Sequence, residues 1–122
     1  MSVKVERKTD SYLKDTVQKL LERSRESGSA FWRDIAIRLS SSRKNYATVN
    51  LGKLQAITSD DDVIVIPGYL LSSGIFNKKI KVSAFKVSEK ALKKLNDAGS
   101  EFISLLDLAS ENPKGTNIKI IR

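Results

Sequence analysis

Short apolar runs that alternate with helical patterns fill the second half of this sequence, and they restrict its fold more than any other feature. VIVI (63–66), followed by the turn signal Pro67-Gly68, and IKVSAF (80–85) have the length and composition of mostly buried strands. The pattern then predicts a helix over 88–99, a short strand at Phe102 and Ile103, a helix through Leu105 and Leu108 that stops at Asn112-Pro113, and a last strand over 117–122. Strands that alternate with helices favour parallel pairing, so residues 59–122 are predicted to form an α/β core.

The first half has a helical pattern instead. Asp10 or Ser11 can begin a helix that Gly28 ends, and a second short helix is predicted over 29–40. The chain's one tryptophan, Trp32, lies on the apolar stripe of this second helix, which predicts a place in the core rather than a stacking platform for a nucleobase. A third helix is predicted over 47–58. Gly52 inside it would weaken the helix by about 1 kcal/mol, which indicates that a neighbouring backbone approaches closely there.

Length and composition predict a single domain. The 122 residues, of which 40% are hydrophobic and 30% charged, are enough to bury one core without disulfides or metals. We expect a flexible arm over 1–9, a basic helical part over 10–58 and the α/β core over 59–122.

The charge balance points to an anionic partner. Lys and Arg number 22 and Asp and Glu 14, a net charge of +8, and most of the arginines lie in the first third of the chain. Such a balance is typical of proteins that bind nucleic acid or an anionic membrane surface.

Several residue types are missing, and their absence excludes whole classes of chemistry. The sequence contains no Cys and no His, which excludes disulfides, thiolate zinc sites, cysteine nucleophiles and Ser-His-Asp catalysis. No apolar run approaches the roughly 20 residues of a membrane span, and the charged N-terminus does not resemble a secretory signal. We therefore predict a cytoplasmic protein with no membrane partner, no cofactor and no small-molecule substrate.

The stretch SRKNYATVNLGKL (42–54) is the strongest candidate for a binding surface. It gathers the cations Arg43, Lys44 and Lys53 around Asn45 and Asn50, with no acidic residue inside it. Cations neutralise phosphates, and short amides supply orienting hydrogen bonds, while Tyr46 is a weaker candidate for stacking on a base. The alternative interpretation is a solvated loop followed by an ordinary helix.

Four more cations are candidate contacts. Arg33 and Arg38 lie off the apolar stripe of the second helix, and Lys78 and Lys79 precede a predicted strand. Arg23 and Arg25 fit the negative end of the first helix as well as they fit RNA.

The aspartates at 60–62 are also open to two interpretations. They form either a polar turn before a strand or part of a metal or acid–base cluster, and no other carboxylate groups with them in sequence.

Several motifs in a fixed order resemble a known family. NLGKL follows SRKNYATV, and then come VIVIPGYLLSSG, KVSAFKVSEKALKKL, NDAGSE and ENPKG. From Gly28 to Arg122 the chain resembles archaeal large-subunit ribosomal protein eighteen-e, a family related to bacterial large-subunit ribosomal protein fifteen. The residues 98–101 depart from the double glycine often found there.

The resemblance implies an α/β fold built as an irregular superhelix of strand-strand-helix turns, preceded by the helical basic segment. It also implies a structural role without catalysis, in which the protein binds and stabilises folded large-subunit ribosomal RNA beside neighbouring ribosomal proteins. The RNA-binding residues expected on this basis, together with the charge pattern, are Arg33, Arg38, Arg43, Lys44, Asn45, Asn50, Lys53, Lys78 and Lys79.

Two other functions are compatible with parts of the sequence. The helix after Tyr46 could be the recognition helix of a sequence-specific DNA-binding protein of helix-turn-helix type. Alternatively, a small enzyme could use the aspartates at 60–62 with a metal ion.

Overall fold

The computed structural model describes residues 11–41 and 46–121. The chain folds into two compact units. The first, which we call the helical unit, consists of Leu105–Thr116 and the described residues of Met1–Tyr46. The second, the sheet unit, consists of Ala47–Ser104 and the described residues of Asn117–Arg122. The arm predicted over 1–9 lies outside the described residues.

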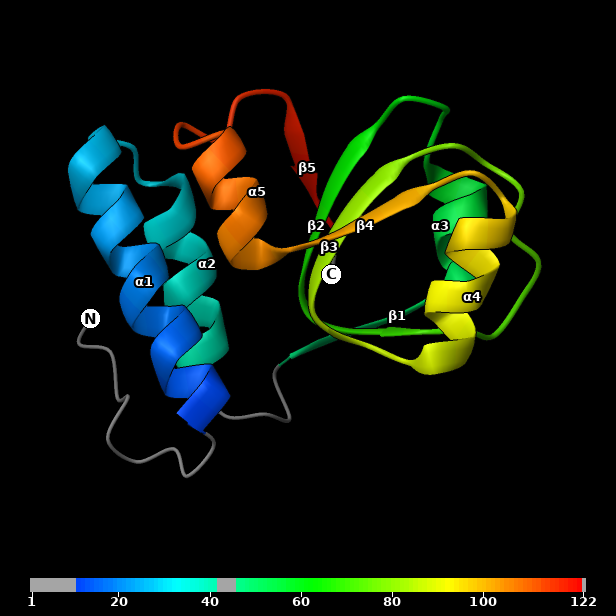
Figure 1. Ribbon diagram of the computed structural model, residues 1–122, viewed down its shortest axis with the longest axis horizontal. Helices are drawn as coiled ribbons and strands as arrows, with labels where there is room; N and C mark the ends of the chain where they lie inside the picture. The colour runs from blue at the N-terminus through cyan, green and yellow to red at the C-terminus, as the bar shows by residue number, and fades with distance from the viewer. Residues whose placement is uncertain (1–10, 42–45, 122) are drawn as a thin grey trace. The chain divides into compact units, whose positions relative to one another are not determined.

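Three helices make up the regular structure of the helical unit: α1 (Ser11–Ser27), α2 (Phe31–Ser40) and α5 (Leu105–Glu111). Both α2 and α5 pack against α1 (Figure 1). The buried side chains come from all three helices and include Leu13, Val17, Leu20, Ile35, Leu39, Leu105 and Leu108. This distribution confirms the apolar stripes that the sequence predicted for the first two helices and for the helix after residue 104.

Two polar details fix the ends of these helices. Gly28 has a φ of +70°, and its N–H donates to the Ser24 carbonyl at 3.0 Å, so α1 ends at the predicted glycine. Trp32 is fully buried, as predicted, and its indole N–H donates to the Asn112 carbonyl at 2.9 Å. Because Asn112 follows α5, this bond ties the end of α5 to α2.

A parallel five-stranded sheet forms the second unit: β1 (Ala47–Asn50), β2 (Val63–Leu71), β3 (Lys81–Val87), β4 (Glu101–Ser104) and β5 (Ile118–Ile120). The strand order is β1-β2-β3-β4, and β5 also pairs with β2. β1 pairs with the C-terminal part of β2 and β5 with its N-terminal part. The α/β class and the parallel pairing predicted from the sequence are confirmed.

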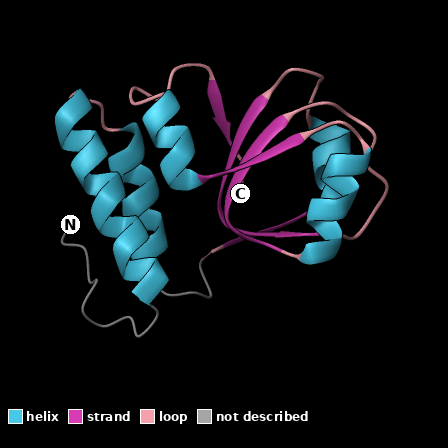
Figure 2. Ribbon diagram, viewed as in Figure 1, coloured by secondary structure: helices cyan, strands magenta, loops and turns pink. Residues whose placement is uncertain are grey.

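Two helices, α3 (Leu51–Ile57) and α4 (Glu89–Asp97), belong to the sheet unit (Figure 2). Their inward side chains, Leu54 and Leu95 among them, share one apolar cluster with residues of β2 and β3. The Ser88 hydroxyl accepts a hydrogen bond from the Ala91 N–H at 3.1 Å, which caps α4 where the sequence predicted its start.

The predicted turn at Pro67-Gly68 is wrong, because β2 continues through both residues. The pairing of β2 with β3 shifts register between Ile66 and Tyr69, which marks a bulge. A bulge accommodates proline, which has no N–H to donate to a ladder. Gly68 lies so close to β1 that a Cβ there would be 2.0 Å from the Ala47 carbonyl oxygen. Close strand packing, rather than a chain reversal, explains this dipeptide.

The third helix, predicted over 47–58, is wrong at its beginning, because residues 47–50 form β1 and the helix starts at Leu51. Asn50 has extended backbone angles, with φ −93° and ψ 154°. Thr48 and Val49 are β-branched residues that favour strands, and β2 offers them a partner edge. The arrangement needed for a helix-turn-helix is therefore not formed here, because a strand directly precedes the proposed recognition helix.

Candidate nucleic-acid interface

The centre of the predicted basic surface, Arg43 with Lys44 and Asn45, lies outside the described residues. The residues on either side of it are held at the C-terminal end of α2. The Ser41 hydroxyl donates to the Arg38 carbonyl at 2.7 Å. On the other side, the Tyr46 hydroxyl donates to the Leu39 carbonyl.

Tyr46 does not support the stacking role considered for it. Its side chain is buried at 7% exposure, so the ring offers no free face to a base. The bond to Leu39 instead anchors the chain just before β1. A buried tyrosine packs its apolar ring in the core and donates its hydroxyl to a carbonyl. The sequence alone does not distinguish this role from stacking on a base.

The two arginines predicted on α2 lie on its outer side. Arg33 is exposed, and Arg38 is half-buried. The Arg38 Nε donates to the Asp34 carboxylate at 3.0 Å across one helical turn. An exposed pair of this kind contributes little to stability, so the guanidinium can exchange partners at small cost.

Asn50 and Lys53 lie at the junction of β1 and α3. Asn50 is the N-cap residue of α3, but its side chain makes no capping hydrogen bond, and Lys53 is exposed. The predicted close approach at Gly52 is confirmed: its N–H donates to the Ser73 carbonyl at 2.9 Å, and a Cβ on Gly52 would lie 3.3 Å from the Gly74 Cα. The loop after β2 is thereby held against the start of α3.

Lys78 and Lys79 differ in what they do. The half-buried Lys78 donates its ammonium N–H to the carbonyl of Thr58, the C-cap residue of α3. Lys79 is exposed, its backbone N–H donates to the Asp60 carboxylate at 2.9 Å, and its stem lies near Gly99. Lys78 therefore stabilises a helix end, whereas the Lys79 ammonium is available at the surface.

The aspartates at 60–62 form a turn before β2, which confirms the first of the two interpretations. The Asp62 carboxylate accepts the Ser59 N–H at 2.9 Å and pairs with the Lys119 ammonium at 3.0 Å. These two contacts, the Ser59 N–H first, hold the pKa of Asp62 below its ordinary value. Across 11–41 and 46–121 no three acidic side chains come together in a way that could hold a metal ion.

Part of the predicted set belongs to the sheet unit: Lys53 lies on α3, and Lys78 and Lys79 lie in the loop before β3, which runs beside this helix. The amides of Gln55 and Asn77 fasten the two together at 2.8 Å. Arg33 and Arg38 belong to the helical unit. Sequence patterns did not single out Gln55 or Asn77, since residues 22 positions apart leave no local signal of pairing.

The comparison with known proteins decides the family. A model of the family "Ribosomal protein 60S L18 and 50S L18e" matches residues 2–122. The chain belongs to this family. Among the curated members of this family, "Large ribosomal subunit protein eL18" of Picrophilus torridus is 91% identical over 122 residues, which is 100% of both chains. The protein of the same name from Thermoplasma acidophilum is 47% identical over 118 residues, 97% of this chain and 98% of its own.

A third relative in the L18 and L18e family, from Thermoplasma volcanium, is 43% identical over 122 residues, 100% of both chains. The resemblance inferred from the ordered motifs is confirmed. The match also extends to the N-terminal part of the chain, where the sequence motifs did not carry the resemblance. In the described portion of this family member, no helix has the length and apolar character of a membrane span.

Proposed function

We propose that this protein is a structural constituent of the large ribosomal subunit that binds and stabilises folded ribosomal RNA. The observation that carries the proposal is the match of residues 2–122 to a ribosomal protein family, with a relative 91% identical over its whole length that is named as a large-subunit protein. Its partners would be large-subunit ribosomal RNA and neighbouring ribosomal proteins, and its location would be the cytoplasmic ribosome.

The net charge of +8 supports an RNA partner on physical grounds. Folded RNA brings phosphates close together, and bound cations relieve their repulsion. We assign this neutralising role to the cations of the predicted set other than Lys78: Arg33, Arg38, Arg43, Lys44, Lys53 and Lys79. Asn45 and Asn50 would supply the hydrogen bonds that fix one docking pose. Lys78 is the weakest member, because its ammonium already binds the Thr58 carbonyl.

This role requires no reaction and no cofactor. A structural RNA-binding protein acts by the free energy of its contacts, so the properties that matter are charge placement, rigidity and shape. The sheet unit provides rigidity, since backbone hydrogen bonds and the two bonds between Gln55 and Asn77 hold the loops beside α3.

The test is co-sedimentation of the tagged protein with cell extract through a density gradient, first at low salt and then at high salt. We expect one copy per large subunit, retained at moderate salt, because an integral ribosomal protein makes many contacts at once. A protein that stays at the top of the gradient, or that leaves with fragmented DNA, would contradict the proposal.

A further inference from the structure

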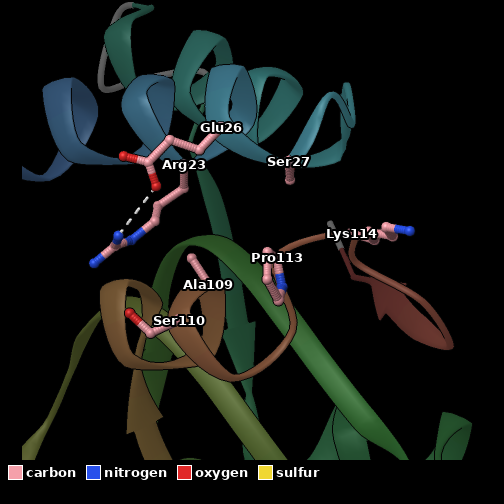
Figure 3. A pocket seen from close by; sticks show the side chains of 7 residues that line it. All are labelled: Arg23, Glu26, Ser27, Ala109, Ser110, Pro113 and Lys114. Carbon is pink, nitrogen blue, oxygen red and sulfur yellow. Dashed lines mark hydrogen bonds and ion pairs between the residues drawn. The ribbon is translucent and has the colours of Figure 1, made fainter.

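The helical unit contains a cleft whose lining includes no described residue of the predicted RNA-binding set. It has a volume of about 500 Å³ and lies between the last turn of α1, the last turn of α5 and the loop that follows α5 (Figure 3). Its lining residues are Arg23, Glu26, Ser27, Ala109, Ser110, Pro113 and Lys114. This volume is within the range of sites that hold small molecules or single nucleotides.

The wall formed by the loop after α5 is held firmly in place. The Asn112 side chain donates to the Thr116 carbonyl at 2.8 Å and accepts the Thr116 N–H at 3.1 Å. The Ser29 hydroxyl donates to the Lys114 carbonyl at 3.0 Å. Gly115 packs so closely on Phe31 that a Cβ there would lie 2.3 Å from the ring. The cleft is therefore preformed, and a ligand would not have to order it.

The surfaces of the cleft combine apolar and cationic groups. Pro113 is exposed and offers apolar surface, and Figure 3 shows the Arg23 and Lys114 side chains extending toward opposite sides of the view. Arg23 is paired with Glu26 at 3.4 Å, but both side chains are largely exposed, at 44% and 67%. Such a pair is worth little, so a phosphate can replace Glu26 at the guanidinium. Among the described residues, no side chain pairs with the Lys114 ammonium.

The charge balance of the cleft is narrow, and Glu26 decides it. Arg23 and Lys114 contribute two positive charges. Glu26 contributes one negative charge, and the C-terminal ends of α1 and α5 add about half a negative charge each. The sum is close to zero. Neutralising Glu26 would make the cleft clearly cationic, whereas a basic partner would need Glu26 to remain charged.

We propose that this cleft receives one nucleotide extruded from a single-stranded region of the bound RNA, an inference that rests on the proposed function. The base would contact the apolar ring of Pro113, and the Arg23 guanidinium would bind a phosphate. Ribosomal RNA offers such nucleotides in its loops and bulges, where bases are free of pairing.

The experiment measures binding of the full chain to transcribed large-subunit ribosomal RNA of Picrophilus torridus at several salt concentrations. Three variants are compared with the wild type: Arg23→Gln, Glu26→Gln, and Arg25→Gln as the matched control. Arg25 is an exposed cation on the same helix that does not line the cleft. Circular dichroism checks that each variant retains its helices.

We expect the affinity for RNA to change in opposite directions in the Arg23 and Glu26 variants. Arg23→Gln weakens binding by roughly fivefold and lowers the salt slope by about 0.7. Glu26→Gln strengthens binding by roughly threefold because it removes the acid that competes with phosphate. Arg25→Gln has a clearly smaller effect than Arg23→Gln.

Three other results overturn the proposal in distinguishable ways. Equal losses at Arg23 and Arg25 would mean that only the overall charge matters. Unchanged RNA binding in both cleft variants, or weaker RNA binding in Glu26→Gln, would mean that no phosphate of the RNA binds at the Arg23 guanidinium. If the wild type itself fails to bind the RNA while correctly folded, the proposed function fails first, and this inference fails with it.

Discussion

Replacing Lys78 with methionine should destabilise the sheet unit, although Lys78 was first selected as a candidate RNA contact. Its ammonium donates to the carbonyl of Thr58, which ends α3, and Thr58 itself is buried at 3% exposure. Methionine retains an unbranched apolar stem and removes the donor and the charge. The Thr58 carbonyl would then depend on water for a hydrogen bond.

The size of the effect follows from the contact and its exposure. A hydrogen bond from a charged donor contributes about 1.5–3 kcal/mol, and the half-buried position of Lys78 places it below that range. We expect a loss of about 1 kcal/mol in the free energy of unfolding, which corresponds to a decrease of about 4 °C in Tm for a chain of this size.

Lys79→Met is the matched control, because it removes the same charge from the neighbouring exposed position. Urea denaturation followed by circular dichroism gives the free energies, and filter binding to large-subunit ribosomal RNA gives the affinities. We expect Lys79→Met to weaken RNA binding with no measurable change in stability. If Lys78→Met were as stable as Lys79→Met and bound RNA less well, the interpretation of Lys78 as a helix-end donor would be refuted.

Three further outcomes are expected. Gly68→Ala should lose about 3 kcal/mol in urea denaturation, because its Cβ would lie 2.0 Å from the Ala47 carbonyl oxygen; a stability equal to wild type would contradict the close strand packing. Arg43→Ala combined with Lys44→Ala should weaken RNA binding and reduce its salt dependence while Tm stays nearly unchanged, and loss of the fold would exclude a surface role. Asp62 has a lowered pKa in the folded state, so its stabilising contribution is present above its ordinary value of 3.8 and is lost as the pH falls through the lowered value. Asp62→Asn should therefore show a smaller decrease in Tm on acidification than wild type, and identical acid profiles would argue against this contribution.

The local sequence pattern was sufficient to predict a helix or strand wherever the conformation of a segment depends mainly on its own residues. The period of apolar residues predicted α1, α2 and α4 together with most of the strands, and Ser88 marked the start of α4 by its capping chemistry. Gly52 signalled a close contact before its neighbour was known, because glycine inside a helix requires a reason.

The candidate site was less predictable, because the role of each side chain depends on a partner that lies far away along the chain. Charge identified Lys78 and Lys79 together, but the Thr58 carbonyl, 20 residues away, separates their roles. Tyr46 was a weaker candidate for stacking on a base, but its ring is buried in the core and its hydroxyl donates to the Leu39 carbonyl. Gln55 and Asn77 gave no signal at all, because amides on a surface are common and their pairing depends on the fold.

The α/β class, the parallel sheet, the burial of Trp32 and, through the ordered motifs, the family could all be predicted from the residues in their order. The strand at residues 47–50 and the continuation of β2 through Pro67 and Gly68 depend on pairing between distant segments. The physical reason is the same in both cases. A short segment with mixed preference adopts the conformation that pairs its backbone N–H and C=O groups, and here the partner strand lies in a distant part of the chain.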